Sequence, residues 1–110
     1  MKLWVDDVRP APNFGYVWVK SVDDAKMVIL CAEMINQKNA EPISIAVPIE
    51  LINMDHDAGD YVSRGGDYIK LLDWLEATGR SYPIHIHSQN PVGVENMRRI
   101  IQRNKWKEIR

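Results

Sequence analysis

Apolar residues occur along this chain in short runs that stop abruptly at charged or turn-forming residues. Four such runs, rich in β-branched and aromatic residues, cover residues 3–5, 16–19, 51–54 and 84–87. A short apolar run bounded by turn residues is typical of a buried strand. A further run, residues 43–47, is separated from the 51–54 run by Pro48 and is either an edge strand or the lead-in to the central strand.

Three longer stretches repeat apolar residues with the period of an α-helix. Their apolar positions are Ala25, Val28, Ile29, Ala32 and Ile35, then Tyr68, Leu71, Leu72 and Leu75, and finally Val94, Met97, Ile100 and Ile101. Ser21 and Asp67 suit the N-caps of the first two helices. Asn90 followed by Pro91 is a cap with a first-turn proline for the third, and Gly79 suits the end of the second.

The predicted order is therefore strand, loop, strand, helix, strand, helix, strand, helix. Strands that alternate with helices predict a mostly parallel sheet covered on both faces. We expect a single α/β domain over residues 1–110, a three-layer sandwich with four to five strands and helices on both faces. The first connection, with Pro10, Pro12 and Gly15, is short for a parallel crossover, which usually takes about a dozen residues or more.

The composition is that of a globular protein, with 45% hydrophobic and 26% charged residues and a formal net charge of −1. This balance gives no global basic field that would demand nucleic acid. No apolar run reaches the roughly 18–20 residues that span a bilayer, and acidic residues follow the start too soon for a signal peptide. We expect a cytoplasmic protein without a membrane partner, and the oligomeric state stays open. The single cysteine, Cys31, falls in a helical apolar pattern and is expected to be packed.

Carboxylates follow two of the predicted strands directly, at Asp6, Asp7 and Asp55. If these strands are parallel neighbours, their carboxyl ends lie side by side, where open sheets bind ligands. Like charges that close raise one another's pKa unless a cation neutralises them. Oxygen ligands of this kind suit a divalent metal, Mg²⁺ first, with Mn²⁺ or Ca²⁺ as alternatives. The other interpretation is that Asp7 caps a turn and Asp55 begins an Asx-turn.

Histidines follow the same strand ends. His56 and Asp57 come directly after Asp55, and His87 closes the last strand. A histidine there suits a general acid or base, because its unperturbed pKa lies near 6.5. A hydrogen-bonded loop histidine is the alternative for His56. His85 begins its strand, far from the tip, and is expected to be structural.

Polar groups for a phosphate lie beside these residues. Ser88 and Asn90 offer a hydroxyl and an amide, and the helix that starts at Asn90-Pro91 offers free backbone N–H groups to an anion. Plain helix capping is the alternative, and the two roles are compatible. Arg9 and Arg64, in loops near the strand tips, are candidate phosphate clamps or solvated side chains.

The last segment is basic. It carries Arg98, Arg99, Arg103, Lys105, Lys107 and Arg110. A nucleic-acid end is one partner for such a segment. A solvated helix face is favoured, because Glu95 and Glu108 dilute the charge and no stacking platform accompanies it.

Three motifs, LWVDDVRPAP at 3–12, INMDHDAG at 52–59 and HSQNPVGVENM at 87–97, together resemble the cyclic-phosphate processing receiver domain family. The resemblance covers nearly the whole chain. It implies a small receiver-like (flavodoxin-like) fold and a site for phosphate esters such as cyclic nucleotide phosphates. Fold alone does not fix function, so the activity has to be argued from the site.

The resemblance also carries residues. Asp6 and Asp7 match the acidic pair after the first receiver strand, Asp55 matches the aspartate that accepts a phosphoryl group in true receivers, and Ser88 matches the serine or threonine after the fourth strand. His56, Asp57, His87 and Asn90 match the cyclic-phosphate branch. The chain departs from receivers in lacking the Lys-Pro after a fifth strand, and we expect the last strand and helix to be missing.

The resulting hypothesis is a metal-dependent phosphoesterase that acts on a cyclic phosphate or a related nucleotide phosphate ester. Asp6, Asp7 and Asp55 would hold the metal, with Asp55 an alternative nucleophile. Asp55, His56 and His87 would be catalytic, and Arg9, Asp57, Ser88 and Asn90 would bind the substrate. The alternative is a non-catalytic receiver-like module that regulates or binds a phosphate ligand.

Overall fold

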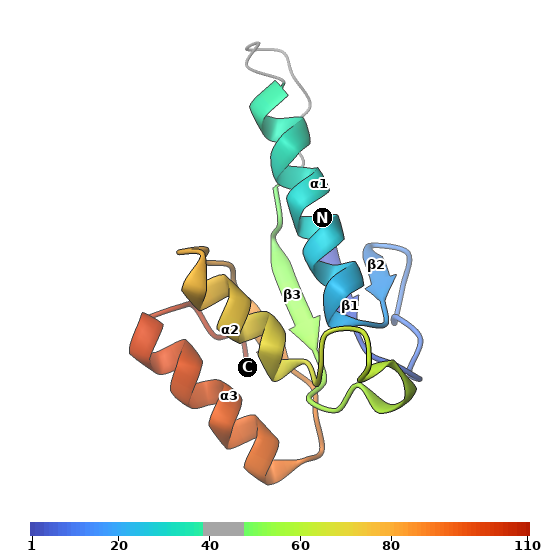
Figure 1. Cartoon of the computed structure of the whole chain (residues 1–110), viewed down its shortest axis with the longest axis vertical. Coiled ribbons are helices and arrows are strands. Elements are labelled where there is room, and N and C mark those ends of the chain that lie inside the picture. The colour runs from blue at the N-terminus through green and yellow to red at the C-terminus, as the bar shows by residue number, and fades with distance from the viewer. Residues whose placement is uncertain (39–47) are drawn as a thin grey trace.

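The computed structural model describes residues 1–38 and 48–110, and within them it has four strands, three α-helices and one short 3₁₀ helix (Figure 1). The elements in order are β1 (Lys2–Val5), β2 (Tyr16–Val19), α1 (Val22–Lys38), β3 (Leu51–Met54), η1 (Gly59–Tyr61), α2 (Ile69–Ala77), β4 (Ile84–Ile86) and α3 (Pro91–Asn104). The four expected strands and three expected helices are confirmed. The run 43–47 lies outside the described residues.

The sheet is parallel throughout, in the order β2-β1-β3-β4. The short first connection therefore does make a parallel crossover, without a helix of its own. The register pairs Val5 with both Val19 and Met54. The carboxyl ends of β1, β2 and β3 therefore lie side by side at the same edge of the sheet.

The expectation of helices on both faces is wrong for the described residues. α1 packs against α2, and α2 packs against α3, so all three lie on one face. The connections β2–α1–β3 and β3–α2–β4 run in the same direction across the sheet, and right-handed crossovers then place both helices on the same side. Only the β1–β2 connection runs the other way, and it is a loop. The domain is thus two layers, with a sheet face that no described helix covers.

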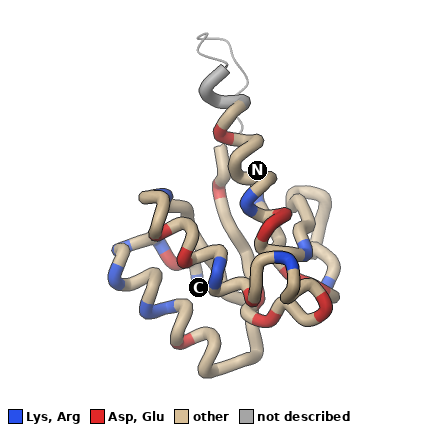
Figure 2. Tube along the Cα trace, in the orientation of Figure 1, with Lys and Arg blue, Asp and Glu red and all other residues tan. Residues whose placement is uncertain are grey.

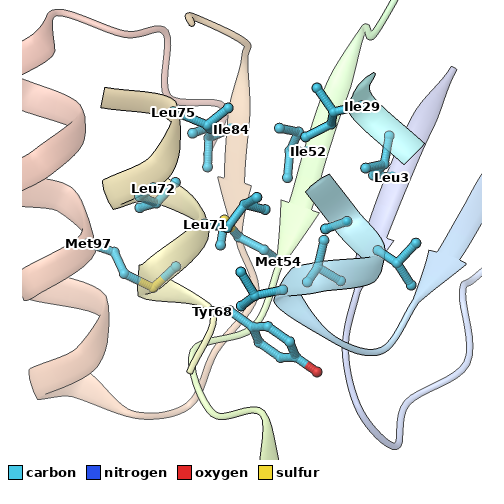
Figure 3. Packing of buried hydrophobic residues seen from close by; sticks show 14 of the residues in the cluster. Leu3, Ile29, Ile52, Met54, Tyr68, Leu71, Leu72, Leu75, Ile84 and Met97 are labelled. Carbon is cyan, nitrogen blue, oxygen red and sulfur yellow. The ribbon is translucent and has the colours of Figure 1, made fainter. Parts of the chain in front are cut away.

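The hydrophobic core fills the space between the sheet and these helices. Alternate strand residues point into it, such as Leu3 and Val5 from β1, and Ile52 and Met54 from β3. Figure 3 shows Leu3, Ile52 and Met54 on the side of the sheet that faces Ile29 of α1 and the leucines of α2. The buried set from the helices comprises Val22, Ala25, Ile29, Ala32, Tyr68, Leu71, Leu72, Leu75, Met97, Ile100 and Ile101. This core makes the sheet rigid beneath the strand ends.

The opposite sheet face carries polar and aromatic residues. By register it presents Lys2, Trp4, Tyr16, Trp18, Asn53 and His85. The loop after β1 turns back over it, since Trp4 Nε1 donates to the Arg9 carbonyl oxygen at 2.8 Å. This face therefore has hydrogen-bonding groups where the other has only aliphatic side chains.

Three local expectations meet different outcomes. Ser21 caps α1 as expected, because its Oγ accepts from Asp24 N at 3.0 Å. Asp67 is not the N-cap of α2, which is Tyr68; its carboxylate instead accepts from Ala58 N at 2.9 Å and braces the preceding loop. Cys31 is exposed and not packed, because the buried stripe of α1 runs through Ile29 and Ala32.

The residues after α3 run beside β4, where Glu108 forms an isolated parallel bridge with Ile84. The basic residues of this region are largely paired: Arg98 with Glu108, Arg99 with Glu95, and Arg103 with Glu76. Figure 2 shows blue and red segments interspersed there. No helix among residues 1–38 and 48–110 is long and apolar enough to cross a membrane.

Candidate functional site

Three carboxylates meet where β1 and β3 end. Asp6 and Asp55 follow the paired residues Val5 and Met54, so the parallel register places them side by side. One oxygen each from Asp6, Asp7 and Asp55 lies within 4.8 Å of the others. Hard oxygen donors that close fit a divalent cation of the size of Mg²⁺ or Mn²⁺. The three carboxylates predicted from the sequence are therefore brought together by the fold.

Asp6 is fully buried and already has donors on both oxygens. Its Oδ1 accepts from the backbone N–H groups of Val8 and Arg9 at 3.0 and 2.9 Å, and its Oδ2 lies 2.9 Å from His87 Nε2. Burial raises the pKa of Asp6, but these backbone bonds and His87 outweigh it, and the pKa is lowered. Asp6 is thus held as a carboxylate at the base of the site.

Asp7 and Asp55 are the more accessible members. The Asp7 carboxylate lies against Gly59, whose φ is +55° and where an added Cβ would come within 2.2 Å of Asp7 Oδ2. Burial raises the pKa of Asp7, and the charges of Asp6 and Asp55 raise it further. Asp55 Oδ1 accepts from His56 N at 2.8 Å. The repulsion at Asp7 is what a bound cation would relieve.

His87 reaches the site from β4, but both of its ring nitrogens face protein groups. Nε2 meets Asp6, Nδ1 lies 2.6 Å from Asn53 Oδ1, and the ring stacks on Trp4 with centroids 4.0 Å apart. The amide of Asn53 continues to the Tyr16 hydroxyl at 3.3 Å. Burial lowers the pKa of His87 despite the nearby Asp6. Both ring nitrogens of His87 are therefore engaged within the protein.

The ring of His56 lies against the first turn of α3. Its Nδ1 is 2.8 Å from Asp57 Oδ1, and Asp57 Oδ2 is 3.5 Å from Asn90 Nδ2. The ring fills the space above Gly93, where a Cβ would come within 2.5 Å of Cγ. Within the part of the chain that the structure describes, no protein group bonds Nε2 of His56. This nitrogen is the ring atom available to a substrate.

Residues 1–103 match the family model of the cyclic-phosphate processing receiver domain. The chain belongs to this family. No match was found among curated proteins or among solved structures. The four-stranded parallel sheet with three helices is the receiver-like α/β fold, and the domain is associated with cyclic-phosphate processing.

The residues of this receiver domain that were predicted to bind a phosphate lie at the start of α3. Asn90 caps the helix, accepting from Gly93 N at 3.0 Å, while Ser88 Oγ accepts from Asn90 N at 3.1 Å. The capping interpretation is therefore confirmed for Asn90, and among the described residues the Ser88 hydroxyl donates no hydrogen bond. The Arg9 guanidinium donates to the His87 carbonyl oxygen at 3.3 Å, beside the same strand end. Arg64 instead pairs with Asp24 at 3.1 Å and ties its loop to α1.

Sequence reasoning missed the residues of the receiver domain that support the site. Trp4, Asn53 and Tyr16 hold His87, yet none is itself a candidate for chemistry. Strand alternation was the available signal, because it places Trp4 with Asp6, and Asn53 with Asp55, on one face. His85 was expected to be structural, and its Nδ1 bonds the Ile109 carbonyl oxygen at 2.7 Å.

Proposed function

We propose that this receiver domain is a metal-dependent phosphoesterase that opens a cyclic phosphate. The convergence of Asp6, Asp7 and Asp55 within 4.8 Å of one another carries the proposal. Three carboxylates at one strand edge are electrostatically costly without a cation. The flanking His56–Asp57 pair and the start of α3 supply the acid–base and anion-binding groups that a phosphate ester needs.

Asp7 and Asp55 would hold a divalent cation, Mg²⁺ by preference, with Asp6 beneath them. When bound, such a cation supplies charge neutralisation of the non-bridging oxygens and makes phosphorus more electrophilic. The Ser88 hydroxyl and Arg9 bind phosphate oxygens, and the amino end of α3 adds a favourable dipole.

His56 supplies the proton transfers. Its Nδ1 bonds Asp57 at 2.8 Å, which fixes the ring and leaves Nε2 toward the substrate. Nε2 takes a proton from water as the water oxygen bonds to phosphorus. The endocyclic P–O bond breaks, and the leaving oxygen receives the proton of the His56 imidazolium, relayed by solvent water, so that one monoester forms and the imidazole is neutral again. His87, with both nitrogens occupied, keeps Asp6 in place.

Phosphorus NMR of a nucleoside 2′,3′-cyclic phosphate with the domain and excess Mg²⁺ tests this proposal. We expect ring opening to one monoester, at least about 100-fold slower in Asp55→Asn and in His56→Gln, as is typical on loss of a group that acts in the chemistry. Asp60→Asn is the matched control, because Asp60 is an exposed carboxylate in the adjacent η1. It should keep full activity.

The regulatory alternative has an observation of its own, since Asp55 stands at the β3 end where receivers accept a phosphoryl group. Line broadening of the phosphate signal without turnover would favour a phosphate-binding module. A mass increase with acetyl phosphate that disappears in Asp55→Asn would favour a phospho-acceptor. Either result, with no ring opening, would overturn the enzyme proposal.

A further inference from the structure

We infer that the groove beside Trp18 binds the aromatic base of the substrate, so that Trp18 selects base-bearing phosphate esters over base-free ones. This inference rests on the proposed function. The groove, of about 520 Å³, runs along the outer side of β2. Its lining includes Trp18, Lys20, Met27, Val28 and Tyr61.

Trp18 is hydrogen-bonded to the backbone of the site and remains partly exposed to solvent. Its Nε1 donates to the carbonyl oxygen of Asp6 at 2.7 Å, while 38% of the residue is exposed. The next strand residue, Val19, accepts from Asp6 N at 3.2 Å, so β2 and Asp6 are joined at two points. An exposed indole held this close to a carboxylate cluster offers a ring face to a ligand whose phosphate is bound there.

Lys20 and Tyr61 complete this subsite. The Lys20 ammonium lies 4.6 Å from the centre of the Trp18 ring and 5.9 Å from that of Tyr61. Tyr61 ends η1, whose first residue, Gly59, packs against Asp7. The subsite is therefore linked to the carboxylates at two points, through the bond from Trp18 to the Asp6 carbonyl oxygen and through η1, which lies against Asp7.

A ligand with both a phosphate and a flat ring satisfies these groups best. In its absence, the ammonium of Lys20 takes the ring face of Trp18 through a cation–π contact. A phosphate at the carboxylate site attracts that ammonium, and the vacated indole face accepts a base by stacking. A nucleoside cyclic phosphate has its base and phosphorus joined through one ribose, and Trp18 is itself bonded to the backbone of Asp6.

The test compares two five-membered cyclic phosphates, adenosine 2′,3′-cyclic phosphate and the base-free glycerol 1,2-cyclic phosphate, with the full chain and Mg²⁺. We expect Trp18→Leu to lower kcat/KM for the adenosine ester roughly 10- to 100-fold, as befits loss of one base stack. Trp18→Phe should keep most of the activity. Both variants lose the bond to Asp6, so their difference isolates stacking. The glycerol ester should be hydrolysed equally by Trp18→Leu and Trp18→Phe, because the two variants lack the same bond to Asp6.

Phe14→Leu is the matched control. Phe14 is a fully exposed aromatic residue that lines a second groove, of about 400 Å³, which Trp18 also lines. Phe14→Leu should leave both substrates unaffected. A loss specific to the adenosine ester in Phe14→Leu would move the base to that second groove and overturn the inference.

Binding separates this inference from the proposed function. Calorimetry with adenosine 3′-monophosphate and glycerol phosphate in Mg²⁺ should give tighter binding of the nucleotide, lost in Trp18→Leu and kept in Trp18→Phe. That pattern without any turnover would support the subsite and reject the enzyme. Equal binding or equal turnover of both esters would reject the subsite while leaving the phosphate site intact. Absence of binding and turnover with either ligand would overturn both.

Discussion

His87 and Asp6 form the contact on which the base of the site depends. A buried carboxylate needs a partner for each oxygen, because an unsatisfied buried polar group is costly. Asp6 receives two backbone donors on Oδ1 and His87 on Oδ2. Stacking on Trp4 and the Asn53 contact hold the imidazole in that position. In the structure, His87 thus contacts Asp6 and Asn53 through its two ring nitrogens.

We predict that His87→Phe destabilises the domain by about 1–3 kcal/mol, because it keeps the stack on Trp4 but leaves Oδ2 of Asp6 without a donor. Urea unfolding at neutral pH measures this. His85→Phe is the control, since His85 lies in β4, two residues before His87, and its Nδ1 bonds the Ile109 carbonyl oxygen. Equal losses in the two variants would show that the contact with Asp6 has no special weight.

At the scale of elements, the start of α3 sets the position of His56. The helix begins at Pro91 with Asn90 as its cap, and its first turn contains Gly93. A glycine in a helix normally costs stability, because it loses more backbone entropy than alanine. Here the missing side chain leaves the space that the His56 ring occupies. Glycine at position 93 lowers the helix propensity of α3, but it allows the His56 ring to pack against the helix backbone.

The effect of Gly93→Ala on the free energy of unfolding should therefore change sign with the residue at position 56. In the native background, the added methyl group would meet the His56 ring at about 2.5 Å, and we expect a loss of stability of about 1–3 kcal/mol from overpacking. In a His56→Ala background the same change should stabilise the domain by roughly 0.5–1 kcal/mol through helix propensity. Denaturant unfolding of the four proteins measures the cycle. A stabilising effect in both backgrounds would contradict the packing described.

At the scale of the whole molecule, the carboxylates of Asp6 and Asp7, after β1, lie close to that of Asp55, after β3, and their negative charges repel one another. Asp7 has a pKa raised by burial and by its charged neighbours. Its folded form binds a proton more tightly than the unfolded chain does. The contribution of Asp7 to the stability of the metal-free domain should therefore be lost as pH rises from 3.8 through its raised pKa. Cation binding at neutral pH would offset that loss.

We predict that Mg²⁺ raises the melting temperature of the native domain at pH 7 and that EDTA reverses this, because a ligand that binds only the folded state stabilises it. Asp7→Asn should raise the melting temperature without Mg²⁺ by a few degrees and remove the response to the cation. Asp60→Asn should respond to Mg²⁺ as the native chain does. A Mg²⁺ response that survives Asp7→Asn would exclude Asp7 as a ligand.

The strands and helices were predictable because each one produces a pattern among residues close together in the sequence. The strand runs, the helical spacing of Leu71, Leu72 and Leu75, and the caps at Ser21 and Asn90 all depend on neighbours close in the chain. Asp67 and Cys31 were misjudged for the opposite reason. The partner of Asp67 is Ala58, nine positions away in another loop, and the exposure of Cys31 depends on which side of α1 the sheet takes.

Local periodicity likewise says nothing about which face of a sheet a helix covers. That follows from the strand order and the handedness of each connection, and β2-β1-β3-β4 places all three described helices together. The free face then carries Trp4, Tyr16 and Asn53 beneath His87, and Trp18 beside Asp6. Strand alternation groups these supporting residues on one face, but it does not show that the helices leave this face uncovered.

By itself, the sequence determined the α/β class, the strand ends at which the acidic residues lie, and the family. These follow from chain-local patterns and from motifs that each occupy a few consecutive residues. Only the tertiary structure decided which side chains contact one another within the site. It engages both nitrogens of His87, leaves one nitrogen of His56 free, and sets Trp18 next to Asp6. A hydrogen bond or a stack is a relation between side chains distant in sequence, so it exists only once the register of the strands has brought them together.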